Sequence, residues 1–191
     1  MVDFSFKASA NSSIGEPSPW VTRFAPLIPP GGTVLDLACG SGRHTRYLLD
    51  RFHPVVALDR DISGLAARKS ESGLEAIEAD LEDGNPWPLA GRRFAGVVVT
   101  SYLYRPLFPA LVAAVAEGGT LIYETFAVGN ERFGRPSNPA FLLRPGELLD
   151  AVRGALRVVA YEDGVVEAPR QAAVQRICAV RQTPGADPPR L

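Results

Sequence analysis

Asp36, Gly40 and Gly42 form the pattern in this sequence whose residue types and spacing suggest chemistry. The preceding segment, residues 33–37, is largely apolar as in a buried strand, and a helical pattern follows the two glycines. A strand that ends in a glycine-rich turn before a helix is typical of sites for nucleotide-like ligands. Glycine has no Cβ, so the turn predicts close approach of backbone to such a ligand.

A second acidic residue supports this interpretation. Asp59 ends the apolar segment 54–59 and lies 19 residues after Gly40. An acidic residue at that offset can accept hydrogen bonds from ribose hydroxyls. The turn reads Gly-x-Gly-x-x-Thr, without the third glycine of a typical dinucleotide site, and no Tyr-x-x-x-Lys pair is found. A nicotinamide-dependent oxidoreductase is therefore the second enzyme class, and a turn with a purely structural role is a further alternative.

The run Asp-Leu-Ala-Cys-Gly-Ser-Gly at 36–42 resembles the first motif of the class I S-adenosylmethionine-dependent methyltransferases, and Asp59 matches their second motif. In that family the glycine turn wraps the methionine part of the cofactor, and the first acidic residue helps orient its amino group. Asp80 and Leu81 stand where the family has an acidic residue at the adenine amino group and a neighbour packed on the ring. The resemblance covers residues 18–182 and implies S-adenosyl-L-methionine as cofactor.

The layout is also similar to that of small bacterial methyltransferases of the tellurite-resistance type, which have a segment like 142–148 before the last strands. The resemblance implies cofactor-binding residues in and around the motifs: Asp36, Ala38, Gly40, Gly42, Arg43, His44, Asp59, Arg60, Asp80, Leu81 and Thr100.

The acceptor of the methyl group is expected over the carboxyl ends of the first, fourth and fifth strands. Tyr102 or Tyr104 could hydrogen-bond an acceptor or shield the methyl group, and Glu124 could accept a proton. Alternatively, the tyrosines only pack and Glu124 holds a backbone amide or pairs with an arginine. Arg105, which follows the fourth strand, is a candidate for substrate binding.

The segment 129–139 is a candidate lid over the acceptor. Arg132 and Arg135 flank an aromatic residue and a glycine there, a combination able to grip an anionic or planar group. Alternatively, both arginines are solvated loop charges or pair with acidic residues.

Composition limits the remaining possibilities. The formal net charge of −1 provides no basic footprint for nucleic acid, so a small-molecule or protein acceptor is favoured. The two histidines and two cysteines have no metal-ligand spacing, and the predicted metal content is none. Neither a signal peptide nor a membrane span is recognised, which predicts a cytoplasmic protein. A non-catalytic module that binds the cofactor is the alternative to an enzyme, and the oligomeric state is open.

The order of elements predicts an α/β fold. Expected strands at 33–37, 54–59, 74–79, 94–100 and 120–126 alternate with helical segments, which indicates a mostly parallel sheet. The last two, 156–161 and 174–180, have no helix-length spacer and should pair antiparallel. Together with the resemblance this predicts a Rossmann-like, doubly wound, seven-stranded sheet with an antiparallel strand near one edge.

Within this plan, the helix after the fourth strand is expected to reach about residue 117 and to end at Gly118-Gly119. Residues 162–164 and 168–170 are expected to connect the last two strands. The predicted domain covers 18–182. Residues 1–17, with Phe4 and Phe6, are a frayed extension or a flap over the site, and 183–191 are a disordered tail.

Overall fold

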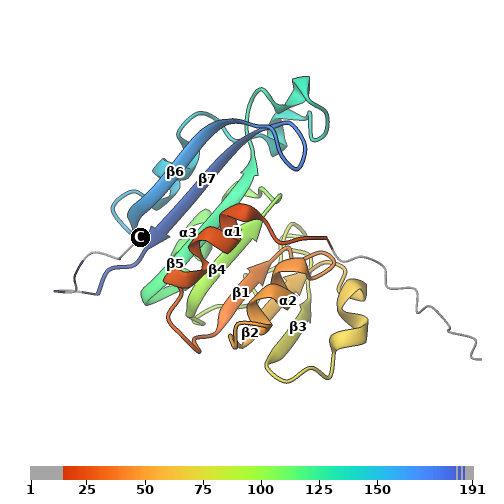
Figure 1. Cartoon of the computed structure of the whole chain (residues 1–191), viewed down its shortest axis with the longest axis vertical. Coiled ribbons are helices and arrows are strands. Elements are labelled where there is room, and N and C mark those ends of the chain that lie inside the picture. The colour runs from red at the N-terminus through yellow and green to blue at the C-terminus, as the bar shows by residue number, and fades with distance from the viewer. Residues whose placement is uncertain (1–14, 184, 186, 188–191) are drawn as a thin grey trace, which may run out of the picture.

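Seven strands form one sheet in the order β3-β2-β1-β4-β5-β7-β6 (Figure 1). The computed structural model describes residues 15–183, 185 and 187, so the predicted roles of Phe4 and Phe6 lie outside the described residues. The strands are β1 (Val34–Leu37), β2 (Val55–Asp59), β3 (Leu74–Glu78), β4 (Phe94–Thr100), β5 (Val115–Phe126), β6 (Arg157–Val166) and β7 (Ala172–Val180).

The α-helices are short, and several connections are 3-10 turns. The α-helices are α1 (Pro19–Phe24), α2 (Arg43–Leu49), α3 (Phe108–Ala114) and α4 (Glu147–Val152). The 3-10 segments are η1 (Ala25–Leu27), η2 (Ser63–Arg68), η3 (Arg105–Leu107), η4 (Asn130–Arg132) and η5 (Pro139–Phe141). None of the described helices is long and apolar enough to cross a membrane.

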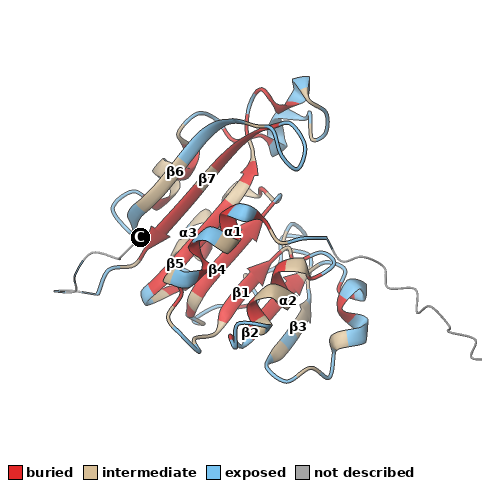
Figure 2. Ribbon diagram, viewed as in Figure 1, coloured by how far each residue is buried: buried red, intermediate tan, exposed pale blue. Residues whose placement is uncertain are grey.

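Apolar packing covers both faces of the sheet. Trp20 and Phe24 of α1 and Leu48 of α2 pack on one face, where α1 and α2 lie in front of the strands in Figure 1. Leu111 of α3 and Leu148 of α4 pack on the opposite face. Central strands covered on both faces read as nearly continuous apolar runs, and Figure 2 shows these strands buried. The predicted doubly wound α/β architecture is confirmed.

The last two strands complete the sheet, and β7 runs antiparallel to both of its neighbours. The pairs β1–β2, β1–β4, β2–β3 and β4–β5 are parallel, whereas β7 inserts antiparallel between β5 and β6. A direct β6–β7 hairpin imposes this direction because no crossover element separates the two strands. The predicted antiparallel pairing is confirmed, but β6 is longer than predicted. Residues 162–164 belong to β6, and residues 167–171 make the connection.

The predicted end of the helix before β5 is wrong. The helix α3 ends at Ala114, and β5 begins at Val115, which pairs with Phe94 of β4. Gly118 and Gly119 lie inside β5, where each makes a backbone hydrogen bond with Arg181. A Cβ on Gly119 would lie 2.9 Å from the carbonyl oxygens of Ala116 and Phe94, so the irregular start of β5 needs glycine there. Pairing with two neighbouring strands overrides the local tendency of the two glycines to end a helix.

Asp36 of β1 is a buried carboxyl group at the centre of the sheet. Its side chain is almost fully buried, and Oδ2 accepts a hydrogen bond of 2.6 Å from the Thr45 hydroxyl of α2. Burial disfavours the charged carboxylate and raises the pKa of Asp36 to about 6, although the Thr45 hydrogen bond acts in the opposite direction. The contact joins β1 to α2 directly below the glycine turn.

We expect Asp36→Asn to stabilise the protein increasingly as pH rises. Between about pH 4 and pH 6 the folded chain keeps the Asp36 proton that the unfolded chain has released, so ionisation destabilises the fold by about 3 kcal/mol by neutral pH. Asparagine avoids this cost and can still accept from Thr45. Urea unfolding at pH 4 and pH 7 should show the variant's advantage growing with pH. A difference between variant and wild type that does not depend on pH would contradict the buried titration.

Candidate functional site

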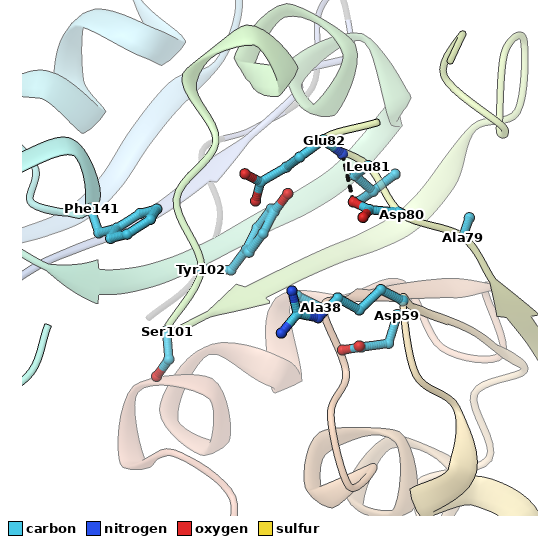
Figure 3. A pocket seen from close by; sticks show the side chains of 10 residues that line it. Ala38, Asp59, Ala79, Asp80, Leu81, Glu82, Ser101, Tyr102 and Phe141 are labelled. Carbon is cyan, nitrogen blue, oxygen red and sulfur yellow. Dashed lines mark hydrogen bonds between the residues drawn. The ribbon is translucent and has the colours of Figure 1, made fainter. Parts of the chain in front are cut away.

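A cavity of about 530 Å³ lies at the carboxyl ends of the parallel strands, where ligands collect in open α/β sheets (Figure 3). Six of its lining residues were singled out by the sequence: Ala38, Asp59, Arg60, Asp80, Leu81 and Tyr102. Four others were not: Ala79, Glu82, Ser101 and Phe141. We refer to this space as the first cavity.

The glycine turn reaches the first cavity through Ala38, whereas Asp36, Gly40 and Gly42 are not among the residues that line it. Ala38, Gly40 and Gly42 have φ of 53°, 53° and 79°, so the chain enters the left-handed region three times within five residues. The Gly40 N–H donates to Asp59 Oδ2 at 2.8 Å, which ties the turn to the end of β2. A Cβ built on Gly40 meets no atom within 4 Å, so the missing side chain leaves open space beside the turn.

The 3-10 segment η2 packs on this turn through two glycines. A Cβ on Gly42 would lie 2.3 Å from Leu65 Cδ2, and a Cβ on Gly64 would lie 2.7 Å from Ser41 Cα. The Gly64 contact is with backbone that cannot move aside, so glycine there sets the spacing between η2 and the turn, whereas Gly42 is required mainly by its positive φ. Sequence reasoning missed Gly64. The available signal was a glycine within a segment otherwise expected to be helical.

Carboxylates dominate the polar surface of the first cavity. Figure 3 shows Asp59 and Asp80 coming from two neighbouring segments, with Glu82 and the ring of Tyr102 near Asp80. Asp59 Oδ1 accepts from the Asp61 N–H at 3.1 Å, and Asp80 Oδ1 accepts from the Glu82 N–H at 2.9 Å. Each carboxylate keeps free lone pairs because an ionised carboxylate accepts about four hydrogen bonds. The cavity therefore suits a ligand rich in hydrogen-bond donors and carrying positive charge.

Tyr102 brings an aromatic ring and a hydroxyl to the wall of the first cavity. Its hydroxyl is buried and lies beside the Glu82 carboxylate (Figure 3). Burial, together with the nearby Glu82 carboxylate, raises the pKa of Tyr102, so the hydroxyl keeps its proton at neutral pH. Tyr104, by contrast, packs against the apolar core and lines neither this cavity nor the next.

A second cavity of about 250 Å³ lies beside the first. The two cavities share Ser101, a non-glycine residue with φ of 56° directly after β4. Of the predicted site residues, Arg43 and Glu124 line the second cavity. Its other polar residues include three that sequence reasoning missed: Ser18, Arg170 and Arg176.

Glu124 is held by two partners at the wall of the second cavity. Its Oε1 accepts from the Ser18 hydroxyl at 2.8 Å, and its Oε2 lies 2.5 Å from Arg176 Nε. Arg176 stands opposite Glu124 in the β5–β7 register and also contacts Glu162 of β6 at 3.4 Å. Of the three roles considered for Glu124, the structure shows the pair with an arginine. This geometry does not favour proton acceptance, because both carboxylate oxygens are engaged.

His44 and Thr100 lie beneath the site and line neither cavity. The Ser18 N–H donates to His44 Nε2 at 3.1 Å, so the ring proton is on Nδ1, which faces the Thr100 hydroxyl at 3.4 Å. Burial, reinforced by Arg43, lowers the pKa of His44 to about 3 and keeps the ring neutral. Both side chains therefore fix the chain around Ser18.

Arg105 anchors the segment that carries Phe141 into the first cavity. Its Nε and Nη2 donate to both oxygens of Glu147 at 2.6 and 2.8 Å, and two more N–H groups bind the carbonyls of Ala140 and Leu142. Burial alone would raise the pKa of Glu147, but Arg105 and Arg144 lower it to about 2. Because these contacts use nearly all its donors, the structure gives Arg105 a positioning role and not a substrate contact.

Arg132 and Arg135, the predicted acceptor clamp, line neither cavity. Their segment is fixed by the buried Asn130, whose amide donates to the Pro136 carbonyl at 2.9 Å and accepts from the Ala173 N–H at 3.2 Å. The guanidinium of Arg132 stays within its own segment, 5.9 Å from the Phe133 ring. The described conformation therefore gives no support to the clamp.

Comparisons with known proteins agree with these motifs. Residues 34–119 match a family model described as a methyltransferase domain. The chain is 39% identical over 97 residues to a trans-aconitate 2-methyltransferase of Sinorhizobium fredii, which is 48% of this chain and 37% of that protein. An enzyme of the same name from an Acidovorax species is 34% identical over 92 residues, 46% of this chain and 36% of that protein. The match thus spans little more than a third of these relatives' length.

Solved structures share the fold over most of the chain. TehB from Haemophilus influenzae superposes with a TM-score of 0.69 at 18% identity, covering 85% of this chain and 61% of TehB. The glycopeptide N-methyltransferase MtfA, complexed with S-adenosyl-L-homocysteine, gives 0.60 at 20% identity and covers 88% and 91%. Residues 34–119 therefore carry a methyltransferase domain, and the chain has the fold of the class I S-adenosylmethionine-dependent methyltransferases that its motifs resemble.

Proposed function

We propose that this chain is an S-adenosylmethionine-dependent methyltransferase with its cofactor site in the first cavity. The observation that carries the proposal is that Ala38 of the glycine turn lines one cavity with Asp59 and Asp80, while the Gly40 N–H is bonded to Asp59. The matched domain spans these residues, which supports the same conclusion. Structures of MtfA with S-adenosyl-L-methionine and S-adenosyl-L-homocysteine share this fold.

The residues present fit this cofactor. Asp59 has free lone pairs for ribose hydroxyls, Asp80 can accept from the adenine amino group, and Leu81 offers an apolar surface to the ring. The open space beside Gly40 suits the methionine part, and the carboxylates of the first cavity balance a positive charge. When bound, the cofactor supplies a methyl group on a cationic sulfur. The protein's task is then to align the acceptor and to exclude water.

The acceptor is a small molecule in this proposal, and it occupies the second cavity. That cavity has room for about eight waters at their liquid volume of about 30 Å³ each, which suits a small molecule. It adjoins the first cavity at Ser101, where an acceptor can meet the reactive end of a cofactor. The names of the curated relatives and of MtfA also indicate non-nucleic-acid acceptors for those proteins.

We expect Asp59→Asn to weaken binding of S-adenosyl-L-homocysteine by about 10- to 150-fold, because hydrogen bonds to a charged acceptor contribute roughly 1.5 to 3 kcal/mol. Asparagine can still accept from the Gly40 N–H, so the turn keeps its tie to β2. Isothermal titration calorimetry measures the change. Asp150→Asn, at an exposed carboxylate paired with Arg153, is the matched control and should bind normally. Unchanged affinity in Asp59→Asn would remove Asp59 from the cofactor site.

Methyl transfer by this protein should not require a metal ion. The described residues include no group of three or more metal-ligating side chains, and a sulfonium needs no Lewis acid to become electrophilic. Formation of S-adenosyl-L-homocysteine on a panel of small acceptors should therefore be the same with and without EDTA. Loss of turnover in EDTA that is restored by a divalent cation would contradict this proposal. Cofactor binding without turnover on any acceptor would favour the non-catalytic alternative.

A further inference from the structure

We propose that the second cavity binds a carboxylate group of the acceptor, through Arg43 and Arg170, so that the acceptor is a small organic acid. This inference rests on the proposed methyltransferase function and names the substrate class of the same site. It starts from the balance of charge among the side chains that line the cavity.

Three arginines line the second cavity, and the described chain neutralises only one of them. Arg176 is paired with Glu124 at 2.5 Å and approaches Glu162 at 3.4 Å. Arg43 and Arg170 form no ion pair with any described carboxylate, although both face the cavity. Glu124 is the only carboxylate among the residues that line the cavity, and its charge is already matched by Arg176. The cavity therefore keeps two uncompensated positive charges.

Weak contacts with the chain hold both free guanidinium groups. Arg170 lies 5.6 Å from the Phe126 ring and donates one N–H to the Arg135 carbonyl at 3.2 Å. Arg43 donates one N–H to the Glu16 carbonyl at 3.5 Å. Each guanidinium has five N–H donors, so most remain for a ligand, in the planar arrangement that matches a carboxylate.

The remaining wall of the cavity limits what the acceptor can be. Phe126, Val166, Pro169 and Val174 provide an apolar surface, and Ser18 and Ser101 provide hydroxyl groups. A cationic acceptor would be repelled by Arg43 and Arg170 and would find no free carboxylate in this lining. A small acid with a short carbon skeleton can place its carboxylate on the arginines and its skeleton on the apolar wall. Its far end then reaches Ser101, where the first cavity begins.

The charge of the two cavities is complementary in this arrangement. The first cavity contains Asp59, Asp80 and Glu82 with Arg60, whereas the second has a surplus of arginine. A cationic ligand in the first and an anionic ligand in the second are each stabilised by their own walls, and each attracts the other.

The test is calorimetric titration of succinate, glutarate and citrate into the full chain loaded with S-adenosyl-L-homocysteine, which permits binding without turnover. Succinamide and glutaramide are the neutral matched probes, and putrescine is the cationic one. We expect at least one acid to bind measurably while the amides and putrescine do not. We also expect the affinity for that acid to fall as salt is raised, because the contact is between charges.

Variants locate the contact. Arg170→Gln and Arg43→Gln should each weaken binding of the acid by about 10- to 100-fold, the effect expected from losing charged hydrogen bonds. Arg157→Gln, at an exposed position of β6 outside the cavity lining, is the matched control and should bind as the wild type does. Thermal unfolding and the affinity of Arg170→Gln for S-adenosyl-L-homocysteine should be unchanged, since Arg170 does not line the first cavity.

The inference is overturned if the acids bind no better than their amides, or if both cavity variants bind the acid as the wild type does. A failure of S-adenosyl-L-homocysteine to bind would instead refute the proposed function. In that case the same acids are titrated into the chain alone, because Arg43 and Arg170 line the cavity without any ligand. Their binding there still decides whether this cavity recognises carboxylates.

Discussion

The ion pair between Glu124 and Arg176 joins the parts of the chain on which the site depends. It bridges β5 and β7 at the edge of the second cavity, and Arg176 extends the contact to Glu162 of β6. On the other side, Glu124 accepts from Ser18, whose N–H is held by the neutral His44. Breaking such a partly buried pair leaves an uncompensated charge, which destabilises far more than an exposed pair does. The start of α1, the helix α2 and the three C-terminal strands are therefore positioned together.

The opposite charge of the two cavities follows from where each takes its residues. The parallel strand β2 ends in Asp59, and Asp80 lies two residues after the end of β3. Acidic side chains therefore gather at the carboxyl ends of these two strands. The second cavity takes its arginines from α2 and from the β6–β7 hairpin, which returns antiparallel to the same edge. The reversal of one strand thus brings basic residues from the end of the chain next to acidic residues from its beginning.

The sequence predicts the residues around the glycine turn better than those of the second cavity, and the reason is distance along the chain. Asp59 is the last residue of β2 and Asp80 lies two residues after β3, so local pattern and motif spacing identify them. Arg176 can be identified as a residue of the second cavity only from the strand register, which places it opposite Glu124. The sequence of β7 itself gives no such indication. Ser101 has a left-handed backbone that the sequence does not signal, since serine, unlike glycine, has no special tolerance for it.

The prediction of the fold is also correct where local sequence determines the structure. It is wrong where pairing between strands distant in sequence determines where an element begins. Alternating apolar segments identify the strands and their parallel order, because burial on both faces is a local property of composition. The start of β5 is determined instead by the neighbours of Gly118 and Gly119 in space. The role of Arg105 likewise depends on Glu147, which lies far from it along the chain. The place of Arg132 depends on the buried Asn130, which is close in sequence but has no pattern that predicts its burial.

The two cavities are built by different parts of the chain, so their linings can vary independently. Apart from Phe141, the first cavity is lined by residues 38–102, whereas most of the second cavity is built by residues 124–126 and 166–176. The matched domain ends at residue 119, before those later segments begin. Substitutions in the connection between β6 and β7 can therefore change the lining of the second cavity without altering a residue that lines the first. Only the exposed residues of the connection, such as Arg170, can change there at little cost to packing, because β7 itself is buried.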